Sequence, residues 1–158
     1  MLLRTHTAFT LGLLIAMLKM LNGLSLTMAV LAALIAYIVN LALDRLGHVK
    51  RGAVYVRSPL THDICLSALW GLVISAAFTY ASMLFNIQVY PIEAVLMGPI
   101  GGLSHMLLDS LTEEGVYVRR RGTWRRVSIA HFRYNNPALN WLFTAIGLAL
   151  MAIPLIYR

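Results

Sequence analysis

Residues 24–43 read LSLTMAVLAALIAYIVNLAL, a stretch without a single charged side chain. About 20 apolar residues in a helix are enough to cross the hydrocarbon core of a bilayer. Residues 64–85 and 138–157 form two further charge-free apolar runs of similar length. These three runs predict transmembrane helices, and therefore an integral membrane protein.

Two further segments are apolar but interrupted. Residues 8–21 are short and contain Lys19, whose long side chain could reach the interface. A cleaved signal peptide is the competing interpretation of this segment because Arg4 precedes it, but no convincing small-residue cleavage site follows. Residues 92–111 contain GPIGG at 98–102, which predicts a kinked, tightly packed helix. We therefore expect an all-α membrane protein, with residues 1–158 forming a single domain of about five transmembrane helices.

Composition agrees with this expectation. The chain is 59% hydrophobic and 12% charged, whereas a soluble domain is about 25% charged. Its 13 Lys and Arg residues outnumber 6 Asp and Glu residues. In so apolar a chain, a topology signal explains this surplus better than nucleic-acid binding does. Cys65 is the single cysteine, which excludes an intrachain disulfide or a thiolate zinc site.

The charges predict an orientation in the cell membrane. Five spans place the N-terminus and the 44–63 and 112–137 loops on one side, together with eleven of the 13 Lys and Arg residues. The positive-inside rule predicts that this side is cytoplasmic and that the C-terminus lies outside. Within the second loop, β-prone residues flank a turn at Gly122, which predicts a hairpin at this face. Its arginines and Trp124 suit contact with anionic membrane lipids.

Candidate metal ligands gather at the same face. They are His6, Asp44, His48, His62, His105 and Asp109. His105, Asp109 and Glu113 follow each other at i, i+4 and i+8, so they share one face of a helix that continues this far. Such ionisable groups are costly in or beside a membrane span, so their convergence predicts a functional metal site. Imidazole and carboxylate ligands suit a divalent ion, with zinc preferred over manganese or iron, and bridging carboxylates could hold two ions for hydrolysis.

The sequence resembles the YdjM-like family of predicted membrane-bound metal-dependent hydrolases over nearly its whole length. The resemblance rests on RTHT at 4–7, DRLGH at 44–48, RSPLTH at 57–62, GLSHMLLDSLT at 102–112, Gly115-Val116, Asn136-Pro137 and Asn140. Two departures stand out. The family's Asp-x-Asp-His is opened to Asp44-x-x-x-His48, so one carboxylate is missing, and Val56 replaces a histidine before Arg57. The paired His and Asp residues are also similar to those of zinc-dependent phospholipases C and related nucleases, which implies phosphoester hydrolysis.

The resulting hypothesis is a membrane-embedded, metal-dependent hydrolase of a phosphoester in a lipid or lipid-linked substrate. We expect Glu113 to act as general base because it continues the ligand stripe, with Glu114 and Asp63 as alternatives, and Arg57 to hold phosphate through its guanidinium fork. Two alternatives remain open. A non-catalytic metal-binding membrane scaffold would have closed coordination, and an ion transporter would need polar residues deeper in the bilayer.

Overall fold

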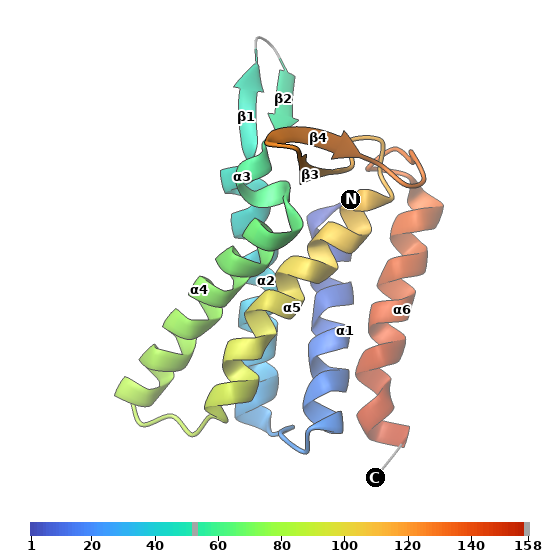
Figure 1. Cartoon of the computed structure of the whole chain (residues 1–158). Coiled ribbons are helices and arrows are strands. Elements are labelled where there is room, and N and C mark those ends of the chain that lie inside the picture. Colours follow the sequence, from blue (N-terminus) through green and yellow to red (C-terminus); the bar gives the residue numbers. More distant parts are fainter. Residues whose placement is uncertain (52–53, 157–158) are drawn as a thin grey trace.

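The computed structural model describes residues 1–51 and 54–156. The helices are α1 (Leu3–Met20), α2 (Leu26–Gly47), α3 (Pro59–His62), α4 (Ile64–Leu84), α5 (Pro91–Ser110) and α6 (Pro137–Ile156). The strands are β1 (His48–Arg51), β2 (Val54–Arg57), β3 (Val116–Arg120) and β4 (Thr123–Val127), and they form two antiparallel hairpins. The five long helices run side by side in one bundle (Figure 1). The expected all-α membrane bundle is therefore confirmed.

The middle of the bundle consists of α1, α2 and α5, which contact one another. On one side α4 packs against α5 and α2, and on the other α6 packs against α1. By length and composition α2, α4, α5 and residues Pro137–Pro154 of α6 can each cross a membrane. The remaining long helix, α1, has 18 residues and is therefore about 27 Å long, comparable with the bilayer core.

Two helices are longer than the sequence predicts, at the end of the bundle that carries the N-terminus and the hairpins. The first begins at Leu3 rather than at residue 8, and the second continues to Gly47 rather than ending at residue 43. His6 consequently lies within α1, and Asp44 lies in the last turn of α2. Apolar counting alone misses these turns because they contain polar residues, both exposed ones such as Arg4 and Arg45 and buried ones such as His6.

Close packing of α4 on α5 explains the GPIGG segment. Gly71 and Gly98 lie backbone to backbone, and a side chain on either residue would overlap the other. Pro99 cannot donate a hydrogen bond to the carbonyl of Val95, one turn earlier. Ser75 Oγ donates to that carbonyl at 2.7 Å, so α4 satisfies the acceptor that the proline leaves free.

The apolar core fills one half of the bundle. Its buried members are Leu14, Leu18, Met28, Leu31, Ala32, Ile35, Ala36, Val39, Leu43, Ala94 and Met97. Most belong to the C-terminal half of α1 and the N-terminal halves of α2 and α5, which lie together. The opposite ends of these three helices carry the buried polar side chains His6, Asn40, His105 and Asp109, beside a smaller apolar cluster of Met1, Phe9 and Leu108.

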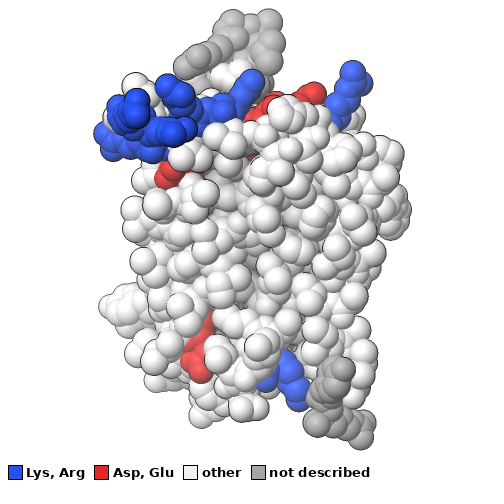
Figure 2. All heavy atoms as spheres, turned by 45° about the vertical axis from the view of Figure 1, so that its right-hand side comes forward, with Lys and Arg blue, Asp and Glu red and all other residues white. Residues whose placement is uncertain are grey.

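That opposite end, which we call the charged end, carries the N-terminus and both hairpins (Figure 1). Figure 2 shows most of the Lys and Arg side chains there, above a wide belt of the surface without charged residues. The predicted hairpin is confirmed: β3 pairs with β4, and Arg121 and Gly122 adopt positive φ angles in a two-residue turn. The β1–β2 hairpin was not predicted.

Candidate metal centre

Four candidate ligands meet just inside the charged end of the bundle. Asp44 from α2, His62 from α3, and His105 and Asp109 from α5 each offer one ligand atom, and these atoms all lie within 4.8 Å of one another. Two ligands bonded to one zinc ion at about 2.1 Å are separated by at most about 4.2 Å. Small side-chain movements would therefore bring all four to a common ion.

Asp109 is central to this cluster. Its Oδ2 lies 3.2 Å from His105 Nε2 and 3.6 Å from His62 Nε2. Asp44 Oδ1 approaches His105 Nε2 to 3.5 Å from the outer side, where 24% of the Asp44 side chain is exposed. The other three side chains are fully buried. The i, i+4 pair on α5 thus shares one helix face, as its spacing predicts.

Asn40 fixes the orientation and tautomer of His105. The Asn40 side-chain NH2 group donates to Ala36 O at 2.7 Å and to Thr10 Oγ1 at 3.0 Å. Its Oδ1 must therefore be the acceptor in the 2.8 Å contact with His105 Nδ1. Because Nδ1 carries the proton, the Nε2 lone pair of His105 faces the cluster.

Thr61 does the same for His62. Its hydroxyl donates to Leu43 O at 2.9 Å and so accepts from His62 Nδ1 at 3.0 Å. Burial lowers the pKa of His62 from 6.5 to about 2, which keeps this imidazole neutral. The Nε2 lone pair is thus free to act as a ligand, and the ring is held by a hydrogen bond on its far side, as in most histidine metal sites.

The donor atoms fit a bound cation. His62 Nε2, His105 Nε2 and Asp109 Oδ2 are buried and have no hydrogen-bond partner among the described residues. All three present lone pairs to one another, and an unpaired buried polar group costs about 1–3 kcal/mol. A cation between the three atoms would remove the repulsion between their lone pairs and the free-energy cost of leaving them unpaired. Imidazole nitrogen and carboxylate oxygen are ligands of zinc, manganese and iron, so the cluster could hold a divalent metal ion.

His6 and His48 lie at the edge of the cluster. The His6 ring stacks on His105 with centroids 4.0 Å apart, and its Nε2 lies 3.1 Å from Asp109 Oδ1. His48, the residue after α2, donates its Nδ1–H to the Asp44 carbonyl, and its ring centroid lies 5.5 Å from that of His62. All six predicted ligands therefore lie in one region. Metal ligation by these two outer histidines stays a prediction.

Arg57 is a buried cation beside Asp109. Its NH2 lies 2.8 Å from Asp109 Oδ1, and its Nε lies 3.2 Å from Glu114 Oε2. Its NH1 donates to Thr112 Oγ1 at 3.1 Å and to Gly115 O at 3.0 Å. The guanidinium fork expected to hold phosphate is thus engaged with protein acceptors, and its structural effect is to hold Asp109 and Glu114 in place.

Two predicted general bases lie elsewhere. Glu113 is not on the ligand stripe, because α5 ends at Ser110, and its side chain is exposed. Asp63 caps α4, where its Oδ1 accepts from the backbone N–H groups of Cys65 at 3.0 Å and Leu66 at 3.1 Å. The expectation that Glu113 extends the stripe is therefore wrong. Glu114 is the acidic residue of the 112–137 loop that reaches the site.

An open hollow of about 720 Å³ leads to the cluster from the charged end. Its walls include Asp44, Arg45, His48, Arg57 and Glu114. Of the four clustered ligands, Asp44 is the one that borders this space. A small molecule or a headgroup could therefore approach the cluster from the side of Asp44.

Asn40 and Thr61 are the positioning residues that sequence reasoning missed. Asn40 precedes Asp44 by four residues, so a polar stripe on an otherwise apolar helix was the available signal. Asn140 belongs to the family resemblance, and the structure gives it a positioning role. Its Oδ1 accepts from Thr5 Oγ1 at 2.7 Å and from Leu2 N at 3.1 Å, which joins α6 to the turn of α1 that carries His6.

The chain matches one protein family, and none of its matches has an assigned activity. Neither the curated proteins nor the solved structures include a match to this chain. A family model described as "Protein of unknown function (DUF1286)" matches residues 1–108, a range that ends just before Asp109. Because this range covers more than half of the 158 residues, the chain belongs to this family.

Proposed function

We propose that the protein is a membrane-embedded, metal-dependent hydrolase acting on a phosphoester of a lipid or lipid-linked substrate. One observation carries the proposal: buried lone pairs of His62, His105 and Asp109 face each other, and the far sides of both rings are anchored. This arrangement suits a cation far better than it suits an isolated protein core. The resemblance to YdjM-like hydrolases, on the motifs around His6, His62 and His105, supports the same conclusion.

Asp44, His62, His105 and Asp109 would hold the ion, with zinc the best match to two imidazoles and two carboxylates. When bound, such an ion lowers the pKa of water and polarises a phosphoryl oxygen. We favour a single ion. Asp109 Oδ1, the oxygen that a second ion would share with His6, already lies 2.8 Å from the Arg57 guanidinium. A second divalent ion at this oxygen would add two positive charges and repel the Arg57 guanidinium.

Three residues at the hollow, Glu114, Arg57 and Arg45, have the remaining roles in the proposed reaction. Glu114 is 38% exposed, borders the hollow and is held by Arg57, so it is placed to accept a proton. Arg57 holds this carboxylate in a fixed direction through the contact of its Nε with Glu114 Oε2. Arg45 is exposed on the same wall and replaces Arg57 as our candidate for contact with the substrate phosphate.

The position of the hollow supports a membrane substrate. Its lining residues belong to the charged end. Figure 2 shows that this end borders the uncharged belt, which is the depth where lipid headgroups would be found. The exposed arginines of β3–β4 would attract anionic headgroups to this face. By the positive-inside rule, we place this face and the N-terminus in the cytoplasm and the C-terminus outside.

Two rival functions fit the structure less well. A purely structural ion would favour a closed site, whereas Asp44 borders an open hollow. A transporter would need a polar path across the bundle. Beyond the polar group of Asn40, Thr10 and Ser104, the described core contains the apolar cluster around Leu14 and Met97. The buried hydroxyls of Ser75, Thr79 and Ser82 on α4 donate to backbone carbonyls and form no charged path.

The test is turnover of phospholipids and lipid-linked phosphates by purified protein, with and without added zinc. We expect metal-dependent release of a phosphate-containing product. Glu114→Gln should lose about 10²–10⁴-fold in rate and keep its metal, while Glu113→Gln serves as the matched control and stays near wild type. Metal-loaded wild type without turnover across this panel would contradict hydrolysis and leave the structural-ion alternative.

A further inference from the structure

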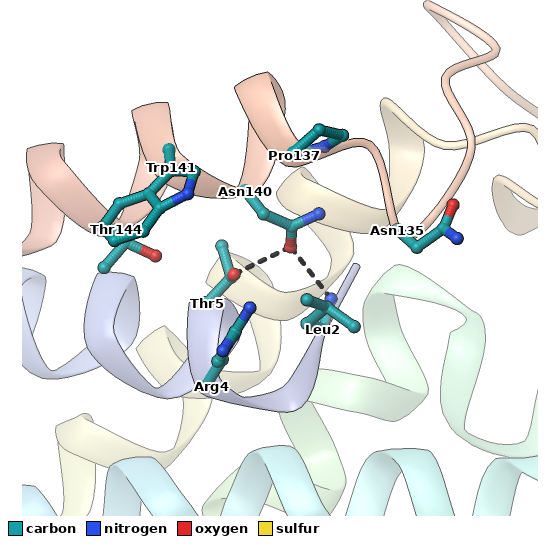
Figure 3. A pocket seen from close by; sticks show the side chains of 8 residues that line it. All are labelled: Leu2, Arg4, Thr5, Asn135, Pro137, Asn140, Trp141 and Thr144. Carbon is teal, nitrogen blue, oxygen red and sulfur yellow. Dashed lines mark hydrogen bonds between the residues drawn. The ribbon is translucent and has the colours of Figure 1, made fainter.

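A second hollow lies between the N-terminal ends of α1 and α6, apart from the clustered ligands. It encloses about 210 Å³ and is lined by Leu2, Arg4, Thr5, Asn135, Pro137, Asn140, Trp141 and Thr144 (Figure 3). Arg4 and Thr5 belong to α1, whereas Asn140, Trp141 and Thr144 belong to α6. We propose that this groove binds the phosphate headgroup of an anionic phospholipid from the surrounding leaflet.

The free donors of the groove suit a phosphate. Arg4 is exposed, and no carboxylate of the described residues forms an ion pair with it, in contrast to buried Arg57 with its two acidic partners. No acidic residue lines the groove. The side chains of Asn135 and Thr144 also make no hydrogen bond among the described residues, so both can donate to a ligand. Arg4 lies between Asn135 and Thr144, which stand at opposite ends of the groove (Figure 3). A guanidinium is a preferred ligand of phosphate.

The floor of the groove is already formed. Asn140 Oδ1 accepts from Thr5 and from Leu2, and its NH2 group donates to the carbonyls of Tyr134 at 2.9 Å and Asn136 at 2.8 Å. These bonds hold α6 against α1 without using Arg4. The walls therefore need little reorganisation when a headgroup enters, which favours binding.

The position of the groove favours a lipid over a soluble phosphate. Trp141 is 72% exposed in the second turn of α6, at the charged end, where tryptophans mark the membrane interface. Below it, Leu142 and Leu148 expose apolar surface on which acyl chains can lie. The backbones of Gly12 and Gly147 touch and close the space between the helices, so the groove admits a headgroup and leaves the acyl chains outside.

The experiment uses the full chain in vesicles, with Trp70→Phe and Trp124→Phe leaving Trp141 as the single tryptophan. Quenching by phosphatidylglycerol with brominated acyl chains is compared with quenching by brominated phosphatidylcholine. We expect a preference for the anionic lipid. Arg4→Gln should weaken this preference about fivefold, the equivalent of one interfacial arginine. Arg133→Gln, an exposed arginine of the same end outside the groove, should leave it unchanged.

Three outcomes would overturn the proposal. The first is equal quenching by the two lipids, and the second is an unaltered preference in Arg4→Gln. The third is displacement of the lipid by millimolar inorganic phosphate, which would assign the groove to a soluble ligand. Arg4→Lys, which keeps the charge but loses the fork, should fall between wild type and Arg4→Gln. Circular dichroism of each variant checks that the bundle is folded. The metal content should not change, so this test is independent of hydrolysis.

Discussion

Replacing Asn40 with leucine should weaken metal binding although Asn40 is not itself a ligand. Leucine keeps the approximate volume but removes the oxygen that accepts the 2.8 Å hydrogen bond from His105 Nδ1. The buried N–H group then has no acceptor, which costs about 1–3 kcal/mol, and the ring is free to turn Nε2 away from Asp109. Loss of such outer-shell partners typically lowers metal affinity by about 10–100-fold. In free energy this is about 1.4–2.8 kcal/mol, the same range as the cost of the unpaired donor.

Competition for zinc between the purified protein and a calibrated chelator measures this affinity. Asn40→Asp keeps an acceptor at the same position. Its zinc affinity should be at least about 10-fold higher than that of Asn40→Leu. Ser75→Ala is the control for general damage, because it removes a buried hydrogen bond between α4 and α5 far from the cluster. It should lower thermal stability and leave zinc affinity near wild type.

Wild-type zinc affinity in Asn40→Leu would refute this reasoning. It would mean either that His105 does not bind the ion through Nε2 or that its ring is held by something other than Asn40. Equal losses of affinity in Asn40→Leu and Ser75→Ala would point instead to a general loosening of the bundle.

Two further predictions concern packing and orientation. Gly98→Ala should cost at least about 1–3 kcal/mol in thermal or denaturant unfolding, because a methyl group there overlaps the backbone of Gly71, whereas Gly101→Ala meets its nearest atom at 3.4 Å and should be tolerated. Equal stability of the two variants would contradict the close contact of α4 and α5. In a Cys65→Ser background, the hairpin-turn variant Arg121→Cys should react with an impermeant thiol reagent only from the cytoplasmic side. Labelling only from outside would reverse the orientation.

The sequence predicts the membrane bundle well because long apolar runs have few other uses. The β3–β4 hairpin was also predictable, since β-prone residues flank Gly122. The β1–β2 hairpin carried a weaker signal of the same kind around Val54 and Val56, within a loop interpreted mainly through its ligands. Helix ends were the least predictable feature, because the last turns of α2 and the first turns of α1 mix polar and apolar residues.

The sequence predicts which metal ligands lie together, but it does not predict the roles of the residues around them. Spacing correctly placed His105 and Asp109 on one face. It failed for Glu113, because the helix ends at Ser110 and Thr112 Oγ1 bonds back to the Asp109 carbonyl at 2.8 Å, and no glycine or proline marks this end. Arg57 could not be assigned either, because its partners lie far away along the chain. Such long-range contacts depend on tertiary structure, which local patterns do not contain.

Metal analysis of the purified protein tests the central claim most directly. After reconstitution with zinc and removal of the excess, elemental analysis should find about one ion per chain in wild type, the number that the four clustered ligands suit. His105→Ala and Asp109→Asn should lose it, and Glu113→Gln should retain it because its side chain is exposed outside the cluster. A folded wild-type protein that retains no zinc, manganese or iron, or a His105→Ala variant that retains the full amount, would contradict the metal centre.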